Sequence, residues 1–523
     1  MGWYINPANK RFSQALRSQI YIDKTGMISY LNKVLDTEQR YVCVSRPRRF
    51  GKTMAAGMLA AYYGRNCDSE KMFLDLKISK DPTFYTYLNH YCVVFLNMHD
   101  FLSSSGGHVD SLIQNISRKL ISELCKEYPT VDYEDKNDLV TAMINIYTAI
   151  DIQFVFIIDE WDCIFRVYQK DTEAQKHYLN FLRDILKDKE YLALVYMTGI
   201  LPIKKYGVHS ALNMFTEFSM TNPQQLAAYV GFTQDEVKFI CDRYETSYDE
   251  MSAWYNGYHF DGVGAVYNPR SVVTAALSKC FDNYWTQTET YEALRIYIEM
   301  NMDGLRDTVI QLLAGERLKI DVTHFTNDMT TFRSYHDVLT LLIHLGYLGY
   351  DFPSSEVFIP NKEISDEFVT SLRDVEWGEI VNSIDNSERL LKSTWRKDEQ
   401  AVAAGIEQAH KETSHLTYYD ENALAYTVSL AYYSARKYYF IERETPAGKG
   451  FADMIFRPRN NHRDKPAMII ELKWNKAAES AINQIIDREY MDCLQDFHGE
   501  VLLVGINFNE KKRHTCIIRS YSL

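Results

Sequence analysis

A glycine-lysine-threonine triplet, Gly51-Lys52-Thr53, stands between the apolar stretch RYVCVS and a segment whose apolar residues have helical spacing. At the N-terminus of a helix, free backbone N–H groups and the helix dipole attract a phosphate group. The lysine would reach the β- and γ-phosphates of a nucleotide, and the threonine hydroxyl would help to hold Mg²⁺. The loop residues that we expect at the nucleotide are Arg49, Phe50, Gly51, Lys52, Thr53 and Met54.

The first residues of this loop include several arginines. Arg46 occupies the position at which a phosphate loop normally begins with glycine. Arg48 and Arg49 follow, and the three arginines would add phosphate or transition-state contacts or extend towards a neighbouring subunit. A solvated basic loop is the alternative, because a GKS or GKT triplet occurs by chance in about one chain in four of this length. The strand-like run before the triplet and the helical pattern after it favour a modified phosphate cradle.

A pair of acids, Asp159 and Glu160, ends the apolar run FVFII about one domain length after the loop. An acid at the tip of a buried strand would bind Mg²⁺ through water, which is the role we expect for Asp159. Glu160 would polarise the water that attacks the γ-phosphate. A helix N-cap is the alternative role for an aspartate in this position.

A second group of charged residues lies near the C-terminus, where Glu471 and Lys473 follow the apolar run AMII. Residues two apart in a strand share a face, and Asp453 stands in the preceding strand-like run. Asp453 and Glu471 would coordinate Mg²⁺ or Mn²⁺, and Lys473 would orient a water or stabilise the charge on a phosphodiester. Nearby predicted helices supply Glu421 as a further metal ligand and Gln484 as a supporting residue.

The E-x-K spacing is common, with about two matches expected by chance in a chain of this length. Glu134-Asp-Lys136 and Glu236-Val-Lys238 also fit it. What distinguishes Glu471-Leu-Lys473 is its place at the end of a buried strand beside a second acid. An exposed salt-bridge cluster on a sheet edge is the alternative interpretation.

The elements that must position these residues differ between the two ends of the chain. Strand-like runs at 40–45, 91–98, 154–159 and 192–200 alternate with helical patterns, which predicts a doubly wound parallel α/β domain over 1–220. We expect a helical lid at 221–285 and a helical middle or linker region at 286–405. Residues 406–523 predict the order α-β-β-β-α-β-β, a separate small α/β domain.

The composition of this 523-residue chain limits the partners and the cellular environment that we expect for it. A net charge of −13 disfavours a surface that coats nucleic acid as a whole, while the segment 456–476 is locally basic. No apolar run approaches the roughly 18 residues that a membrane span needs, and no secretory signal is visible. Nine scattered cysteines without a CxxC pair are typical of small buried residues in a reducing cytoplasm.

Eight segments, taken in order, resemble the predicted AAA-ATPase-like family of bacterial proteins, and the resemblance covers roughly residues 5–285. They are YIDKT (21–25), SRPRRFGKT (45–53), IIDEWD (157–162), TGILPIKKYG (198–207), ALNMFTEFSM (211–220), WYNGYHF (254–260), VYNP (266–269) and HLGYLGYD (344–351). The RPRRFGKT form is usual in that family, so Arg46 is not a departure from it. The resemblance implies that Thr198 lies near the γ-phosphate and that Asp23 and Lys24 lie near the nucleotide pocket.

Residues 410–523 resemble the PD-(D/E)XK nuclease superfamily, through Glu421, Asp453, Glu471-x-Lys473 and the QIIDREY helix that begins at Gln484. Ala452 stands where a proline usually precedes the first acid. The resemblance implies a restriction-endonuclease-like α/β domain with metal-dependent nuclease activity. The superfamily also includes inactive members.

Taken together, these features predict a cytoplasmic P-loop NTPase (AAA-like) with a helical lid, a helical middle region and a nuclease-like tail. We expect ATP and Mg²⁺, with Mn²⁺ as an option, and a nucleic-acid partner, DNA in preference to RNA. No membrane partner is expected, and arginines beside the loop allow a homo-oligomer. The alternative is an ATP-dependent switch or interaction protein whose tail is catalytically inactive and only binds nucleic acid or a protein.

Overall fold

The structure, a computed structural model, describes residues 2–522 except 107, 204–210, 286–290, 300–301, 303, 324, 326–331, 374–377, 413–420, 460–461 and 510–512. The chain forms two compact units. Residues 1–290 and 318–366 make up the N-terminal unit, and residues 291–317 and 367–523 make up the C-terminal unit. The middle region that the sequence sets at 286–405 is therefore divided between the two units.

A five-stranded parallel sheet forms the centre of the N-terminal unit, as the alternating pattern predicts. Its order is β2-β3-β4-β1-β5, from β1 (Tyr41–Ser45), β2 (Cys92–Asn97), β3 (Phe154–Asp159), β4 (Leu192–Gly199) and β5 (Thr216–Phe218). Strands β1, β3 and β4 are buried along their whole length, which explains their continuous apolar runs. Because β4 lies between β1 and β3, its carboxyl end separates the phosphate loop from Asp159.

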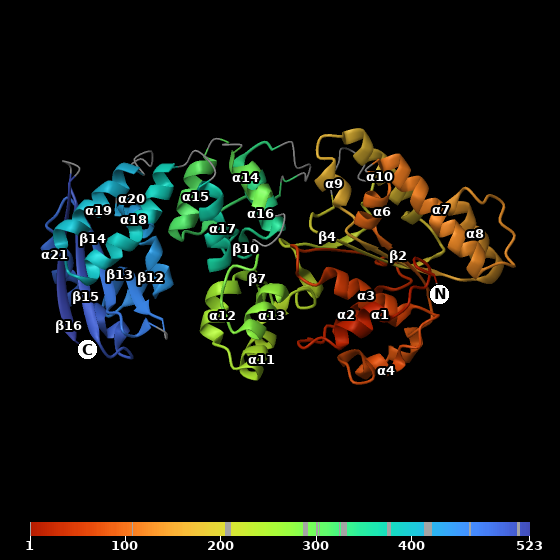
Figure 1. Ribbon diagram of the computed structural model, residues 1–523, viewed down its shortest axis with the longest axis horizontal. Helices are drawn as coiled ribbons and strands as arrows, with labels where there is room; N and C mark the ends of the chain where they lie inside the picture. Colours follow the sequence, from red (N-terminus) through yellow and green to blue (C-terminus); the bar gives the residue numbers. More distant parts are fainter. Residues whose placement is uncertain are drawn as a thin grey trace. The chain divides into compact units, whose positions relative to one another are not determined.

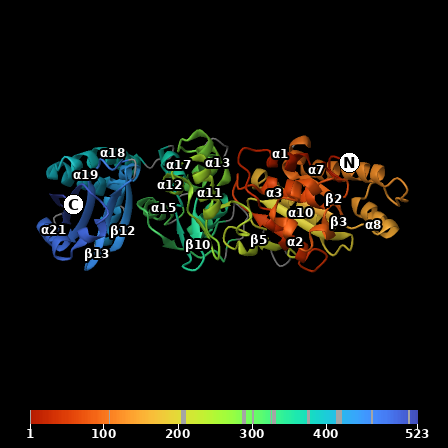
Figure 2. The ribbon, with the colours of Figure 1, turned by 90° about the horizontal axis from the view of Figure 1, so that it is seen from below.

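Helices cover both faces of this sheet (Figures 1 and 2). One layer contains α1 (Lys10–Leu16), α2 (Gly26–Val34) and α3 (Lys52–Tyr63). The other contains α6 (Met98–Ser104), α7 (Val109–Glu127), α8 (Leu139–Ile150), α9 (Cys163–Val167) and α10 (Thr172–Leu186). Short turns of helix, η1 (Lys77–Lys80), α4 (Glu70–Phe73) and α5 (Phe84–Tyr87), connect α3 to β2.

Beyond β5 the unit becomes mostly helical, and small antiparallel sheets brace it. Helices α11 (Gln234–Tyr244), α12 (Tyr248–Tyr255) and α13 (Pro269–Ser278) pack around a sheet of order β6-β8-β7, formed by Phe232–Thr233, Gly264–Tyr267 and Tyr258–Phe260. Helix α16 (Tyr335–Leu345) and a second sheet, formed by β9 (Leu318–Lys319), β10 (Gly349–Asp351) and β11 (Glu356–Phe358), follow. Neither small sheet was expected, because strands of two to four residues carry too little periodicity to be recognised.

The C-terminal unit contains a five-stranded sheet of order β12-β13-β14-β15-β16. Its strands are β12 (Tyr439–Ala447), β13 (Gly450–Pro458), β14 (Ala467–Trp474), β15 (Glu500–Phe508) and β16 (His514–Ser522). Only β14 and β15 pair in parallel, and they are joined through α21 (Ala478–Asp487). With α20 (Glu421–Ala431) before β12, the predicted order α-β-β-β-α-β-β is confirmed.

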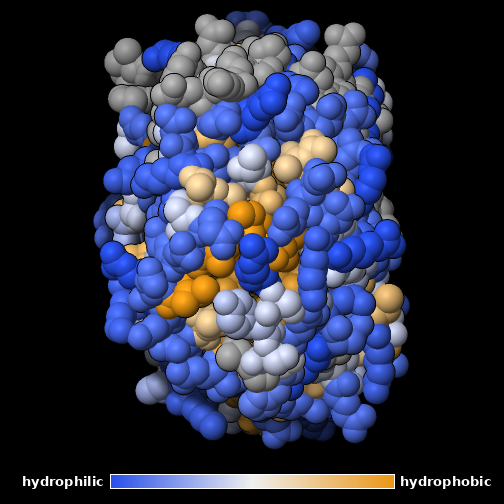
Figure 3. Space-filling view, turned by 90° about the vertical axis from the view of Figure 1, so that its left-hand side faces the viewer, coloured by the Kyte–Doolittle hydropathy of each residue, from blue (hydrophilic) through white to orange (hydrophobic). Residues whose placement is uncertain are grey.

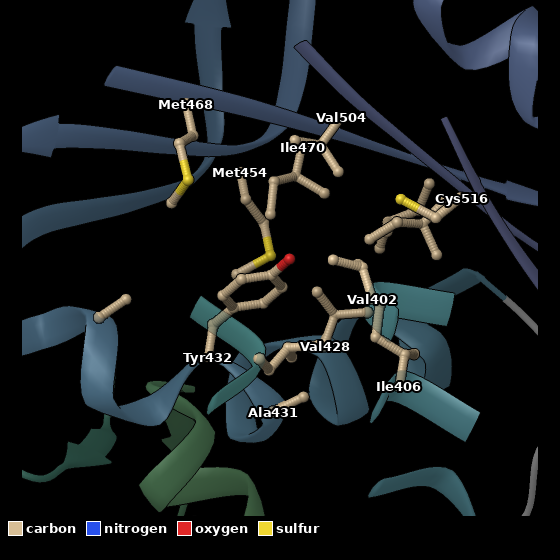
Figure 4. Packing of buried hydrophobic residues seen from close by; sticks show 14 of the residues in the cluster. Val402, Ile406, Val428, Ala431, Tyr432, Met454, Met468, Ile470, Val504 and Cys516 are labelled. Carbon is tan, nitrogen blue, oxygen red and sulfur yellow. The ribbon is translucent and has the colours of Figure 1, made fainter. Parts of the chain in front are cut away.

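Helices also enclose this second sheet. Figure 4 shows Val402 and Ile406 of α19 (Glu399–Glu412) and Val428 of α20 packed against Met454, Ile470 and Val504 of the sheet. The opposite face packs against α21 through residues such as Ile469 and Ile482. The unit also includes α14 (Tyr291–Glu299), α15 (Leu305–Ala314) and α18 (Gly378–Trp395), whereas α17 (Lys362–Arg373) contains residues of both units.

One face of the molecule is seen as a space-filling surface in Figure 3. On the face seen in Figure 3, hydrophobic side chains gather near the middle and hydrophilic side chains surround them. Over the part of the chain that the structure describes, no helix combines the length and the apolar character needed to cross a membrane.

Candidate functional sites

The phosphate loop connects the buried strand β1 to α3. Gly51 is the N-cap residue of α3 and has a φ of 94°, in the left-handed region that glycine adopts without strain. Lys52 is the first helical residue, and its ammonium donates hydrogen bonds of 2.8 Å to the carbonyl oxygens of Arg46 and Pro47. The loop therefore curls around the lysine side chain and keeps it at the N-terminus of α3.

Lys52 is a buried cation whose hydrogen-bond acceptors here are neutral carbonyls. Burial lowers its pKa to about 8, and the carboxylates of Asp162 and Asp159 oppose that shift. A phosphate group placed at the helix N-terminus would supply the negative charge that favours the protonated form.

Asp159, Thr198 and Thr53 come together from three separate parts of the sequence. The Thr198 hydroxyl at the end of β4 donates a 2.6 Å hydrogen bond to Asp159 Oδ1. Burial raises the pKa of Asp159, and hydrogen bonds from Thr198 and Thr53 act in the opposite direction. Carboxylate and hydroxyl oxygens are the ligands that Mg²⁺ prefers, directly or through water, so these residues fit such an ion.

Glu160 is held by an arginine that the sequence reasoning missed. Arg166 of α9 places its Nη2 3.0 Å from Glu160 Oε2 and its Nε 3.3 Å from Asp162 Oδ2. Asp162 in turn accepts hydrogen bonds from the backbone N–H groups of Ile200, at 3.1 Å, and Leu201, at 3.0 Å. Hydrogen bonds of Asp162 thus join the IIDEWD segment to the end of β4. The only sequence feature that could have indicated the role of Arg166 is its spacing of four residues from Asp162.

The expectation that all three arginines of the loop reach a phosphate or a neighbouring subunit is wrong for Arg46. Its side chain is fully buried and donates 2.9 Å hydrogen bonds to the carbonyl oxygens of Ser45 and Phe218. The guanidinium also lies over the ring of Phe260, 4.8 Å from the ring centre. Arg46 therefore joins β1 to β5 and to the small β6-β8-β7 sheet.

A cavity of about 890 Å³ opens beside the phosphate loop. Its basic lining residues are Lys24, Arg48, Arg49, Lys52, Arg166 and Arg270, and its apolar lining includes Phe12, Ile20, Ile22, Phe232, Val273 and Leu277. Its volume falls within the usual range for small-molecule sites. Cations beside an apolar wall suit a ligand that has a polyphosphate and an aromatic base.

Two further residues of the cavity were not singled out from the sequence. Arg270 directly follows the VYNP segment, where the side chain of Asn268 caps the N-terminus of α13. Tyr229 lies before β6. The VYNP motif was recognised, but nothing in it shows that the next residue lines a cavity shared with a loop more than 200 residues earlier.

Lys24 and Asp23, which the family resemblance placed near the pocket, have different environments. Lys24 lines the cavity, and its ammonium contacts Glu236 Oε2 at 2.5 Å and the Ala228 carbonyl at 2.7 Å. The Asp23 carboxylate instead accepts hydrogen bonds from Thr25 N–H, at 2.8 Å, and Lys77 N–H, at 2.6 Å. Asp23 therefore fixes the turn that leads into α2.

The second site lies in the C-terminal sheet, where β13 and β14 separate. Their paired residues run from Met454 to Phe456 on one strand and from Met468 to Ile470 on the other. Asp453 and Glu471 are the next residues on each strand, at the point where the pairing ends. Asp453 Oδ2 accepts a 2.7 Å hydrogen bond from Leu472 N–H, which holds the two strands together across the opening.

Glu471 is the most constrained side chain of this site. Its Oε1 accepts a 2.8 Å hydrogen bond from the Lys473 ammonium and a second one from Gln484 Nε2. Gln484 also contacts the Tyr490 hydroxyl at 3.1 Å. Burial raises the pKa of Glu471 to about 7, the charge of Asp453 adds to that effect, and Lys473 opposes it.

One oxygen of this carboxylate has the properties of a metal ligand. Among the described residues, Glu471 Oε2 has no hydrogen-bond partner although it is buried, and it lies beside the charge of Asp453. Two carboxylates fit Mg²⁺ or Mn²⁺, which prefer hard oxygen ligands. In the described part of the chain, no group of three or more His, Cys, Asp or Glu side chains is arranged so that it could hold a metal ion. Glu421 begins α20, but its side chain lies outside the described residues.

Comparison with known proteins agrees with this division of the chain. Residues 11–209 match the family model described as predicted AAA-ATPase, and residues 420–517 match the model of the PD-(D/E)XK nuclease superfamily. The chain is also 26% identical over 282 residues to an uncharacterized protein in the vnfD 5′ region of Azotobacter chroococcum mcd 1. That similarity covers 52% of this chain and 51% of the relative, so the chain spans about half the length of the curated relative it matches.

Each family match contains one of the two sites. The phosphate loop, Asp159 and Thr198 fall within the first match, and Asp453, Glu471 and Lys473 fall within the second. The chain therefore joins a predicted AAA-ATPase region to a region of the PD-(D/E)XK nuclease superfamily.

Proposed function

We propose that this protein binds and hydrolyses ATP and that its P-loop region controls a metal-dependent nuclease that cleaves phosphodiester bonds, with DNA as the favoured substrate. The observation that carries the nuclease assignment is the buried Glu471–Lys473 pair, contacted by the partly exposed Gln484, beside Asp453 at the opening between β13 and β14. We propose the boundaries 1–220 for the ATPase core, 221–285 for its lid and 406–523 for the nuclease-like domain, with 286–405 as a middle region whose residues belong to both units.

In the ATP site, the residues of the loop would bind the nucleotide. The N–H groups from Arg49 to Met54 and the Lys52 ammonium would receive the phosphates, with Lys52 leaving the carbonyls of Arg46 and Pro47. Thr53 and Asp159 would hold Mg²⁺, which neutralises phosphate charge when it is bound. Thr198, hydrogen-bonded to Asp159 at 2.6 Å, would sense the γ-phosphate.

Glu160 would orient and polarise the attacking water in this site. Its carboxylate is held by Arg166 at 3.0 Å, so the arginine sets where Glu160 points. A base must be within hydrogen-bond reach of its water, and a change of partner at Arg166 would alter that geometry. Glu160 is therefore the proposed catalytic base and Arg166 its positioning residue.

In the nuclease-like site, Asp453 and Glu471 would hold Mg²⁺ or Mn²⁺. The ion, when bound, would lower the pKa of water and neutralise charge on the phosphodiester. Lys473 would orient the water and stabilise the negative charge that develops on the phosphate. Gln484, braced by the Tyr490 hydroxyl at 3.1 Å, keeps the Glu471 carboxylate in place.

Incubation of the full chain with supercoiled plasmid and Mg²⁺ or Mn²⁺, with and without ATP, tests the proposal. Metal-dependent nicking that disappears in Asp453→Ala, but not in the exposed control Asp464→Ala, supports the nuclease. A change in nicking on addition of ATP, absent in Lys52→Ala and present in the control Lys126→Ala, supports its control by the P-loop. Nicking that Asp453→Ala leaves unchanged would reject the assigned site.

One observation favours the alternative, an ATP-dependent switch with an inactive tail. Lys473 and Glu471 form a close ion pair at 2.8 Å, and such a pair can serve packing alone. That role predicts ATP binding without cleavage under any metal condition. It also predicts that Asp453→Ala changes nothing but stability.

We propose a reducing cytoplasm as the setting. All nine cysteines lie within the described residues as free thiols, and most of them are buried. Homo-oligomerisation through Arg48 or Arg49 is part of the same proposal. Analytical ultracentrifugation with and without ATP tests it, and a monomer under both conditions would reject it.

A further inference from the structure

Arg443 is a half-buried cation beside the nuclease-like site. It lies on β12 directly opposite Met454, the neighbour of Asp453 on β13. Burial lowers the pKa of Arg443, and the negative charges of Glu444 and Asp453 oppose that shift. Its guanidinium lies 5.4 Å from the centre of the Tyr426 ring. An arginine near a metal-binding carboxylate pair is well placed to contact a phosphate group.

In the structure, Arg443 forms an ion pair with Glu316. The exposed fractions are 17% for the Arg443 side chain and 23% for that of Glu316, so water screens this pair less than a surface pair. Glu316 is distant in sequence and comes from the end of α15, which packs against α20.

The backbone holds Glu316 in this place. Gly315 ends α15 with a φ of 99°, and its N–H donates to Leu312 at 3.0 Å. The N–H of Glu316 donates a 3.0 Å hydrogen bond to Gln311, which completes the usual glycine-terminated end of a helix. The backbone position of Glu316 is thus fixed by the end of the helix.

The segment that carries Glu316 has an unusual place in the chain. Residues 291–317 belong to the C-terminal unit, whereas the residues before and after them, up to 290 and from 318, belong to the N-terminal unit. Both ends of the segment therefore continue into the unit that contains the phosphate loop. A conformational change in that unit could therefore move Glu316 through the connected backbone.

We propose that Arg443 binds a backbone phosphate of the nucleic-acid substrate and that Glu316 competes with that phosphate for it. The inference rests on the proposed function for the class of substrate, and it adds a binding residue and an intramolecular competitor. A carboxylate and a phosphate both suit the planar donor fork of arginine, and two anions cannot share it without repulsion. Nucleic acid must therefore displace Glu316 before its phosphate reaches Arg443.

Binding of a short fluorescein-labelled DNA duplex to the full chain in EDTA tests this inference, because no metal-dependent cleavage occurs there. We expect Glu316→Gln to bind roughly fivefold more tightly, the equivalent of losing one partly exposed ion-pair competitor. We expect Arg443→Gln to bind more weakly than wild type. In the Arg443→Gln background, Glu316→Gln should have no further effect, since the competition needs the arginine.

The control is Glu500→Gln, which removes the same charge from an ion pair with Lys397 at 2.6 Å in the same unit. Its affinity should equal that of wild type, and thermal unfolding of every variant confirms folding. Equal affinities for wild type and Glu316→Gln, equal gains in both glutamate variants, or no DNA binding by any variant would each overturn the inference. If plasmid is never cleaved while the expected affinities are found, the nuclease proposal fails and this inference stands.

Discussion

Among the residues that the structure describes, each unit has one lysine that is buried near carboxylates, but the partners of the two lysines differ. The Lys52 ammonium donates to the neutral carbonyls of Arg46 and Pro47, at 2.8 Å each. The Lys473 ammonium donates to the carboxylate of Glu471, also at 2.8 Å. The first lysine is held ready by backbone dipoles, whereas the second already has its counter-ion.

This difference determines which ligand each site can recruit. The cavity beside Lys52 has several further cations, among them Arg48 and Arg270, and it suits an anionic ligand. At the second site, Asp453 and Glu471 outnumber Lys473, so one negative charge remains when both carboxylates are ionised. The N-terminal site would therefore attract a polyphosphate and the C-terminal site a metal cation.

The largest expected effect comes from removing negative charge at the second site with Asp453→Asn. The amide keeps the size of the side chain but removes the carboxylate that is proposed to bind the metal, and we expect the rate of plasmid cleavage to fall by about three orders of magnitude or more. Single-turnover cleavage at saturating Mn²⁺ measures it. The exposed Asp464→Asn should cleave at the wild-type rate, and a similar loss in both variants would point to general damage.

Lys52→Ala should have the next largest effect, because it removes the cation of the phosphate loop. We expect the affinity for ATP to fall by about 10- to 100-fold, in line with the loss of a charge-assisted hydrogen bond worth about 1.5–3 kcal/mol. Isothermal titration calorimetry measures it, with Lys126→Ala as the control. Unchanged ATP affinity in Lys52→Ala would remove the contrast between the two sites.

Much of the fold could be predicted because its strands are buried on both faces. Continuous apolar runs such as FVFII specify a central parallel strand, and the polar residues after them mark its carboxyl end. The order of elements after Glu421 follows from the same periodicity. Asp159, Glu471 and Lys473 were predicted as site residues because they end such strands.

Contacts between distant segments could not be predicted in this way. Nothing near Arg46 shows that its side chain turns inward to Phe218, or that Arg166 holds Glu160. Arg270 and Arg443 are likewise placed by packing between elements, which a local pattern does not record. Sequence reasoning finds residues at the ends of strong elements and misses the cations that neighbouring elements bring to them.

A smaller effect is expected from pH, through the pKa of Glu471, which is raised to about 7. Metal binding needs the ionised carboxylate, so cleavage should fall as pH drops below 7, approaching tenfold per unit. In metal-free protein the sign for stability is opposite. The folded state keeps the proton of Glu471 when the unfolded state has lost it, so this group makes the protein less stable as pH rises from about 4.5 to 7.

Glu471→Gln isolates that contribution, since the amide does not titrate. Between pH 5 and pH 8 the stability of the variant relative to wild type, measured by urea unfolding in EDTA, should rise by about 2–3 kcal/mol. Glu363 and Glu367, whose pKa values are also raised to about 7, remain in both proteins and cancel in the difference. A difference that does not vary with pH would mean that Glu471 is ionised throughout.

The smallest expected effect separates Asp23 from its neighbour Lys24. Asp23 accepts hydrogen bonds from Thr25 and Lys77 and shapes the turn before α2, whereas Lys24 lines the cavity beside the phosphate loop. Asp23→Ala should therefore cost about 1 kcal/mol of stability, as the loss of a helix cap does, and leave the affinity for ATP unchanged. Lys24→Met should instead weaken ATP binding, because it removes a cation from the cavity. If Asp23→Ala weakened ATP binding as much as Lys24→Met, the turn before α2 would have to be counted as part of the site. The positive charge of the cavity alone would then no longer explain which ligand the cavity binds.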